Sequence, residues 1–308
     1  GAELVSRASA VVLEVAYTEY NEGAPSVKEI TDYMNEIGFE ERMSIGEHYD
    51  GETIVQKDLV FTKRLSMIEN IIDIGKENKD LYKNNKPFAH IKLENMFPND
   101  LLDDVLSDIE KTEYEYYKFC TVGNCFSEFG ESTIKLTDYL VGDEWVEFLR
   151  NITEIKDLKS DKDWHGAGIN IEPRGSHLEP HTDFNRHNGM WRRVNVLLFL
   201  SKDWKDEWGG YNELGHVEGE HYVVDRKYKP EFNNVIIFNT SNYSYHGFDL
   251  VSCPNDKNRM VISCYYYSNE RGEHGEASDT TNYVGWDRER KKQKEYHDRI
   301  GTGWRKLK

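Results

Sequence analysis

With 308 residues, 38% of them hydrophobic and 31% charged, the chain has the composition of a globular protein and is not a largely disordered one. Its formal net charge of −17 disfavours nucleic acid as a partner, because phosphate backbones repel an acidic surface. No apolar run approaches the roughly 20 residues that a membrane-spanning helix needs, so we expect no membrane segment.

The cysteines show no CxxC spacing, which disfavours a structural zinc site or a disulfide framework; they are Cys120, Cys125, Cys253 and Cys264. We interpret them as reduced thiols and expect a cytoplasmic protein. The chain lacks an initiator Met and opens on GAELVSRASAVVLEVAY, which resembles folded sequence. We therefore expect a piece of a longer protein whose N-terminus lies upstream.

Residues 1–63 predict a strand, a helix and two further strands. Residues 10–17 (AVVLEVAY) are apolar and β-branched, as in a buried strand. Ser26 is a candidate N-cap for a helix over 27–38, which ends at Gly38. The segments ERMSI and KDLVFTK predict two short strands. This piece is too small to bury both faces of a sheet.

The segments GAEL, VVLEVAY, YNEGAPSVKEITDYMNEIGFEE and KDLVFTKR resemble the C-terminal part of an FkbM-type methyltransferase, a Rossmann-like S-adenosylmethionine enzyme. The resemblance implies that residues 1–63 are a partial α/β segment of that fold. The glycine-rich turn that would bind the methyl donor is not in this chain. We expect a structural remnant that does not bind that cofactor by itself.

Residues 64–86 predict a linking helix, and FAHIKLENMF predicts a half-buried strand in which Ala89, Ile91 and Leu93 point inward. Two amphipathic helices follow, capped by Asn99 and Asp143. After Asp163 short apolar runs alternate with turn residues, which predicts an all-β module; the runs are GAGINIEP, RVNVLLFL, NVIIFNT and RMVISCYYYS. Residues 271–308 predict a polar C-terminal tail.

The stretch PHTDFNRHNGMWRR holds a His-x-Asp pair, His181 and Asp183, and His246 follows a strongly apolar run. Two imidazoles and one carboxylate are the ligand set that binds one face of Fe(II) and leaves positions open. In an extended segment, residues two apart share a face, so His181 and Asp183 can bind together. A His-x-Asp pair by itself is usually incidental, and the candidate third ligand, His246, supports its interpretation as part of a metal site.

Arg259 begins the segment RMVISCYYY, thirteen residues after His246. If His246 ends one strand and Arg259 opens the next antiparallel one, both side chains can point into one barrel. There the guanidinium can hold a carboxylate in bidentate fashion. Ser263 would share the inward face, while Met260, Ile262 and Cys264 would face the other way.

The segment from GSHLEPHTDF to RMVISCYYYS resembles the Fe(II)/2-oxoglutarate dioxygenases of the prolyl 4-hydroxylase superfamily. The resemblance implies an α+β, mainly β fold with a double-stranded β-helix (jelly-roll) core and supporting N-terminal helices over residues 87–270. It implies His181, Asp183 and His246 as catalytic iron ligands. Arg259 matches the residue that binds the distal carboxylate of 2-oxoglutarate, and Ser263 matches a hydroxyl that assists it.

Two positions depart from the pattern of these dioxygenases. Asn212, in WGGYNEL, stands where an apolar residue is expected. Many relatives place a tyrosine hydroxyl near the co-substrate, but Leu198, and Ile171 or Glu172, fall at the expected positions. Asn170 is the candidate that can substitute for the tyrosine.

The implied enzyme uses Fe(II), 2-oxoglutarate and O2, with ascorbate as a possible addition, and releases succinate and CO2 as it hydroxylates its substrate. The substrate classes left open are a small metabolite, a sugar or glycan, and a prolyl residue of a peptide. Two alternatives are a methyltransferase whose barrel is an accessory binding module, and a cupin-like barrel with an incidental metal. Arg259 argues against the cupin, which has no need of a carboxylate clamp. Oligomeric state is left open.

Residues 184–193 form the predicted loop beside the iron, where we expect substrate choice to be made. Arg186, Arg192 and Arg193 either contact an anionic substrate there or are solvated strand ends. Three further histidines are not expected to be ligands; they are His165, His177 and His187.

Overall fold

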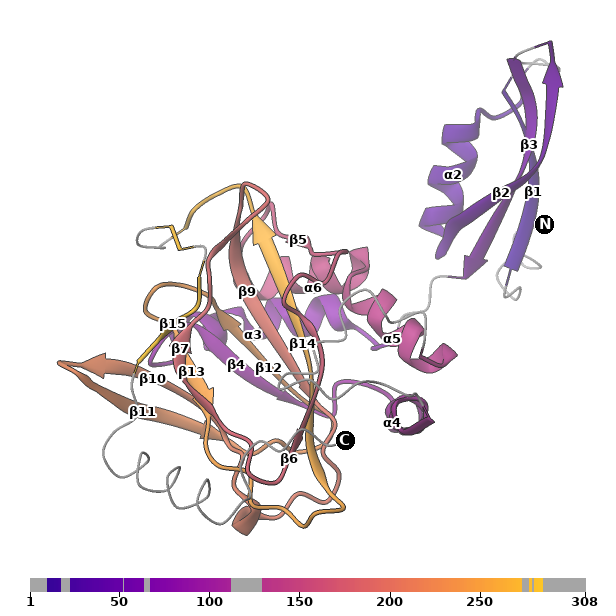
Figure 1. Ribbon diagram of the computed structural model, residues 1–308. Helices are drawn as coiled ribbons and strands as arrows, with labels where there is room; N and C mark the ends of the chain where they lie inside the picture. Colours follow the sequence, from indigo (N-terminus) through magenta and orange to yellow (C-terminus); the bar gives the residue numbers. More distant parts are fainter. Residues whose placement is uncertain are drawn as a thin grey trace. The chain divides into compact units, whose positions relative to one another are not determined.

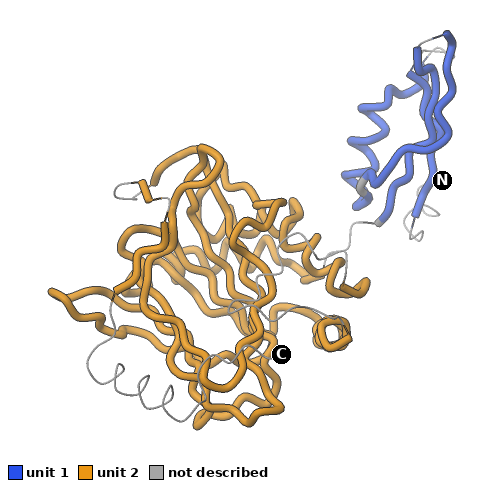
Figure 2. The backbone as a smooth tube through the Cα atoms, in the orientation of Figure 1, with its two compact units in different colours: residues 1–66 blue, residues 67–308 orange. Residues whose placement is uncertain are grey.

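The computed structural model describes residues 10–17, 23–51, 53–63, 67–111, 129–272, 277–278 and 280–284. The chain divides into two compact units, Gly1–Ser66 and Met67–Lys308, which Figure 2 shows in different colours. None of the described helices combines the length and the apolar character needed to cross a membrane. Cys120 and Cys125 lie outside the described residues, and Cys253 and Cys264 are buried free thiols.

The described residues of the first unit form a three-stranded antiparallel sheet in the order β1-β3-β2, together with helix α2. Its elements are β1 (Ala10–Ala16), α2 (Val27–Glu36), β2 (Phe39–Asp50) and β3 (Thr53–Lys63). Helix α2 lies along one face of the sheet (Figure 1). A small core joins them, made of Val15, Met34, Phe39, Leu59 and Phe61.

Ser26 is the N-cap of α2, as predicted. Its hydroxyl accepts from the Glu29 backbone N–H at 3.2 Å, and the Glu29 carboxylate accepts from the Ser26 backbone N–H at 2.8 Å. This reciprocal capping box satisfies two N–H groups that the first helical turn leaves without partners.

Two sequence expectations fail in the first unit. Strand β1 is not buried, because only Val15 of its seven residues is inaccessible. The segments ERMSI and KDLVFTK belong to long paired strands, β2 and β3, and not to two short ones. All pairings in this sheet are antiparallel, whereas a doubly wound sheet is mostly parallel. The Rossmann-like arrangement is therefore not confirmed.

Helices cover one side of the second unit. They are α3 (Ile71–Asn84), α4 (Asn99–Lys111), α5 (Glu131–Leu140) and α6 (Asp143–Thr153). Helices α4 and α6 lie where they are predicted, although neither predicted cap holds: Asn99 is the first residue of α4, and the N-cap of α6 is Gly142 and not Asp143. Helix α3 is shorter than the predicted linking helix and packs on α6, so it is part of this unit and not a linker. Helix α5 was not predicted.

The described strands of the second unit form two antiparallel sheets (Figure 1). The larger has the order β4-β12-β9-β14-β5, with β6 paired to β14 and β8 to β9; its strands are β4 (His90–Glu94), β5 (Lys159–Ser160), β6 (Gly168–Pro173), β8 (Arg186–His187), β9 (Met190–Phe199), β12 (Asn234–Asn239) and β14 (Asn258–Ser268). The smaller has the order β11-β10-β13-β7-β15; its strands are β7 (Leu178–Thr182), β10 (Asn212–Glu218), β11 (His221–Tyr228), β13 (Tyr245–Phe248) and β15 (Asn282–Tyr283).

Successive strands change sheet: β12 lies in the larger sheet, β13 in the smaller and β14 in the larger again. This alternation is the connectivity expected of a jelly-roll core. The α+β, mainly β architecture with supporting helices is as predicted. Strand β15 comes from the predicted polar tail, most of which lies outside the described residues.

The larger sheet has two different faces. One face of β9 packs against the helices through Val194, Val196 and Leu198. The other face presents Asn195 and Leu197 to the smaller sheet. At the sheet edge, His90 of β4 alternates with Ala89 and Ile91, which were predicted to point inward, so the predicted half-buried strand would expose it. It is fully buried, because its ring bonds to the Phe88 carbonyl at 2.7 Å and the Tyr228 hydroxyl at 2.7 Å.

Candidate active site

Two histidines face each other across neighbouring strands of the smaller sheet. His181 of β7 pairs in register with His246 of β13, and residues directly opposite each other in an antiparallel pair point to the same face. Their ring centroids are 4.3 Å apart. Asp183 follows β7 and adds a carboxylate on the same side. The structure thus brings together the three predicted metal ligands.

One ligand atom from each of the three side chains lies within 4.8 Å of the other two. The Nε2 atoms of His181 and His246 are 3.7 and 3.8 Å from the Asp183 oxygens. The opposite ring nitrogens are fixed by backbone carbonyls, Nδ1 of His181 by Glu179 at 2.9 Å and Nδ1 of His246 by Ser244 at 3.0 Å. These bonds make Nδ1 the protonated nitrogen and leave the Nε2 lone pairs pointing at the centre.

The protonation states of Asp183 and His246 are those that bind metal ions. Burial would raise the pKa of Asp183, but His246, His181 and Arg192 hold it well below its usual range. Burial and the neighbouring His181 lower the pKa of His246 to about 4. At neutral pH the cluster therefore offers a carboxylate and a neutral His246 imidazole, the forms in which these groups bind metal ions.

Arg192 lies beside Asp183 and is 1% exposed. Its guanidinium is centred 3.6 Å from each of the Phe184 and Tyr265 rings, and it donates to the Tyr267 hydroxyl at 3.1 and 3.2 Å. Its Nη1 is 3.7 Å from Asp183 Oδ1. The solvated strand end considered for Arg192 is therefore wrong, because aromatic rings and Asp183 enclose this cation.

Asn195 of β9 donates to the other oxygen of Asp183, Oδ2, at 3.2 Å. Its own Oδ1 has no hydrogen-bond partner among the described residues. This asparagine was not predicted as a site residue. Its position in the run RVNVLLFL could have identified it, because a polar residue inside a buried apolar strand needs a partner.

Arg259 approaches from the facing sheet. His246 lies within the short strand β13, and Arg259 lies near the start of β14, the next strand along the chain, but the two strands belong to different sheets. Both nevertheless line one cavity of about 280 Å³. Nε of Arg259 donates to the Gly210 carbonyl at 2.8 Å, and the guanidinium is centred 4.1 Å from the Phe248 ring. No carboxylate of the described residues forms an ion pair with it.

Ser263 and Asn170 line the same cavity, and Asn170 Nδ2 donates to Ser263 Oγ at 3.1 Å. Met260, Ile262 and Cys264 of β14 pack on the helical side, as predicted. Asn212 is buried in the cavity wall, and its Nδ2 has no partner among the described residues. The sequence indicated Asn212, because it is a polar residue at a position where relatives have an apolar one.

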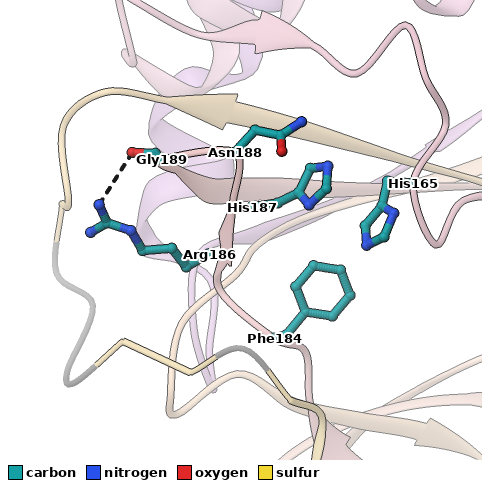
Figure 3. A pocket seen from close by; sticks show the side chains of 6 residues that line it. All are labelled: His165, Phe184, Arg186, His187, Asn188 and Gly189. Atoms are coloured by element: carbon teal, nitrogen blue, oxygen red, sulfur yellow. Dashed lines mark hydrogen bonds between the residues drawn. The ribbon is translucent and has the colours of Figure 1, made fainter.

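The predicted loop over residues 184–193 is largely a hairpin, β8 with β9, and not a flexible loop. His187 and His165 stack face to face with ring centroids 3.9 Å apart, and Phe184 makes an edge contact with His165; Figure 3 shows these three side chains. Arg186 extends to the other side, where it donates to the Gly189 carbonyl at 3.4 Å. These side chains line a second, open cavity of about 350 Å³.

The remaining charged and imidazole candidates do not reach the triad. Arg193 donates to Ser268 Oγ and the Glu270 carbonyl, both at 3.0 Å. His177 is buried outside the metal cluster.

Comparison with known families gives the decisive observation. Residues 167–267 match the model of the 2OG-Fe(II) oxygenase superfamily, and this range contains His181, Asp183, His246, Arg259 and Ser263. The chain contains a 2OG-Fe(II) oxygenase domain. Enzymes of this superfamily are 2-oxoglutarate-dependent and use Fe(II), 2-oxoglutarate and O2. No curated protein matches the chain, and the methyltransferase resemblance of residues 1–63 is not shown by any of these comparisons.

Solved structures similar to this oxygenase include three prolyl hydroxylases, each 14% identical. The Pseudomonas putida prolyl-4-hydroxylase covers 67% of this chain and 99% of its own, with a TM-score of 0.41. A Phytophthora capsici prolyl 4-hydroxylase covers 67% of both chains with a TM-score of 0.45. A Trichoplax adhaerens prolyl hydroxylase, solved with a hypoxia inducible factor peptide fragment, covers 65% of this chain and 91% of its own, with a TM-score of 0.46.

Proposed function

We propose that the chain is a hydroxylase in which His181, Asp183 and His246 hold Fe(II). The observation that carries this proposal is the convergence of two imidazole nitrogens and one carboxylate within 4.8 Å, buried and with no other acidic or thiol ligand in the cluster as described. This donor set fits Fe(II) and leaves coordination positions for a co-substrate and O2. It does not fit a structural zinc site, which is closed by four protein ligands.

The rest of the cavity fits 2-oxoglutarate. The Arg259 guanidinium has one described hydrogen bond and no ion pair, so donors remain for a carboxylate. The buried amide of Asn212 has a donor without a partner. We infer that Arg259 binds the distal carboxylate, with Ser263 and Asn170 beside it, because a guanidinium recognises carboxylates in bidentate fashion.

Bound iron, 2-oxoglutarate and O2 supply an oxidative decarboxylation that yields succinate and CO2 and hydroxylates the substrate. The side chains of this protein orient the reactants and exclude water. Arg192 and Asn195 hold the Asp183 carboxylate in place. Phe248 and Phe199 shield the Arg259 guanidinium, with centroids 4.1 and 5.3 Å away, so its pairing with a carboxylate takes place away from bulk water.

The substrate is proposed to be a small metabolite, a sugar or glycan, or a prolyl residue. The rings of Phe184 and Tyr283 line the metal cavity, and His165 and His187 extend the ring surface beyond Phe184. Flat ring surfaces suit a substrate that presents C–H bonds on a saturated ring, as sugars and proline do. The peptide complex of the Trichoplax enzyme is a precedent for the prolyl alternative.

Turnover tests the proposal. Purified protein with Fe(II), 2-oxoglutarate and O2 is expected to form succinate, alone or with candidate sugars and prolyl peptides. Asp183→Ala removes the one anionic ligand and is expected to abolish succinate formation. Asp256→Ala, which changes an exposed acidic residue outside the metal cluster, is the matched control and retains it. Succinate formation that persists in Asp183→Ala would contradict the assignment.

A further inference from the structure

Glu172 lies directly opposite Arg259 across the β6–β14 pair. Residues opposite each other in an antiparallel pair point to the same face, and both side chains line the cavity that also holds the metal cluster. The Glu172 carboxyl makes no hydrogen bond and no ion pair within the described part of the chain. An acidic group thus stands beside the cation that is proposed to bind the co-substrate.

An ionised Glu172 would oppose this role, because a carboxylate beside Arg259 repels the incoming carboxylate and competes for the guanidinium. The neutral acid has the opposite effect, since its O–H is a hydrogen-bond donor. Burial raises the pKa of Glu172 to about 7, and Arg259 opposes this rise. The acid form is therefore present at and below neutral pH.

Arg259 is the charged group that acts on Glu172. The inward-facing neighbours on β14 and β6 are uncharged, namely Val261, Ser263 and Asn170. The other titratable side chains of the cavity belong to its metal end or rim; they are His181, Asp183, His246, Arg192, Tyr265 and Tyr283. The protonation of Glu172 therefore depends on burial, on Arg259 and on what occupies the space between them.

We propose that Glu172, as the carboxylic acid, binds the co-substrate by donating its hydroxyl to the 2-oxoglutarate carboxylate that Arg259 holds. This rests on the proposed function, because it needs 2-oxoglutarate in the cavity. Below about pH 7 the proton is already on Glu172, and 2-oxoglutarate binds without proton uptake. Above that pH the free protein holds an ionised Glu172, so binding takes one proton from solvent and weakens as pH rises.

The test is anaerobic titration calorimetry of 2-oxoglutarate into the Fe(II)-loaded full chain, in buffers of different ionisation enthalpy. For the native protein we expect Kd to rise about tenfold between about pH 6 and about pH 8. We also expect uptake of close to one proton per ligand at the higher pH and almost none at the lower.

Two variants isolate the carboxyl. Glu172→Gln keeps an N–H donor and cannot ionise, so its Kd stays low and flat across this pH range, without proton uptake. Glu172→Leu has no donor, so its Kd is raised roughly ten- to hundredfold at all pH values. Thermal unfolding checks that both variants are folded. If Glu172→Leu does not fold, the nearly isosteric Glu172→Gln variant decides the question by itself.

A native Kd that stays flat with pH, or a Glu172→Gln variant that keeps the native pH profile and proton uptake, overturns this role of Glu172. Failure of the proposed function gives a different result, because neither the native protein nor either variant then binds 2-oxoglutarate at any pH.

Discussion

Arg192 and Arg193 are adjacent cations with opposite surroundings. Arg192 points between the sheets, where Phe184 and Tyr265 enclose it and Asp183 lies 3.7 Å away. Arg193 points the other way and bonds to Ser268 and the Glu270 carbonyl. Groups that orient a metal-binding carboxylate affect metal affinity although they do not touch the metal.

We therefore predict that Arg192→Met weakens Fe(II) binding roughly ten- to hundredfold. Met fills much of the same space, but it cannot pair with Asp183 or donate to the Tyr267 hydroxyl. Competition with a metal chelator measures the affinity, and thermal unfolding checks folding. Arg193→Met is the matched control and leaves the affinity unchanged. Equal losses in both variants would show that Arg192 acts only through stability.

The sequence could identify the proposed metal ligands, which the structure brings together, because their residue types and spacing follow from the chemistry of such a site. His181, Asp183 and His246 are a set with few other uses. It could not identify Arg192, because which of two neighbouring arginines points inward depends on strand register, and a shift of one residue reverses every side chain. Glu172 was recognised by position, but its relation to Arg259 needed the β6–β14 pairing.

At the scale of elements, the helices hold the larger sheet by close packing. Helix α3 crosses α6 at Gly75, where an added Cβ would lie 2.9 Å from the Phe148 carbonyl oxygen and 3.1 Å from its ring. Phe148 is itself fully buried. The absence of a side chain at Gly75 is therefore what allows the two helices to approach so closely.

We predict that Gly75→Ala destabilises the protein by about 1–3 kcal/mol, as overpacking does. In an exposed helix the same change would stabilise by about 1 kcal/mol, so the sign of the effect tests the helix contact. Denaturant unfolding measures it, with the exposed Glu77→Ala of the same helix as a control that stays within about 0.5 kcal/mol. A stabilised Gly75→Ala would show that α3 and α6 are not packed in this way.

Helices α4 and α6 were predictable because their apolar residues recur at helical spacing. Helix α5 was not, because its segment ESTIKLTDYL contains Thr133 and Thr137, residues that are unfavourable inside isolated helices. Both are buried in the fold, and the Thr137 hydroxyl bonds to the Thr133 carbonyl at 2.9 Å. Tertiary packing outweighs local preference there. The antiparallel pairing of the first unit was also not visible in the sequence.

At the scale of the whole molecule, the site depends on how two sheets meet. His181 and His246 come from the smaller sheet, and Arg259 comes from the larger. The sequence predicted that they share a cavity from consecutive strands, but not that these strands belong to different sheets, because strand signals are local and do not show to which sheet a strand belongs. The alternation of β12, β13 and β14 between sheets puts the proposed metal ligands opposite the Arg259 guanidinium.

The most direct test of the central claim is anaerobic titration of the full chain with Fe(II) and then with 2-oxoglutarate, followed by the visible absorption that a 2-oxo acid gains when it chelates Fe(II). We expect one Fe(II) per chain and the appearance of this absorption on adding 2-oxoglutarate. His246→Ala removes a proposed iron ligand and is expected to lose both signals, whereas His216→Ala, which changes an exposed histidine of the same sheet, keeps both. A native protein without the absorption, or a His246→Ala variant that retains it, would contradict the claim.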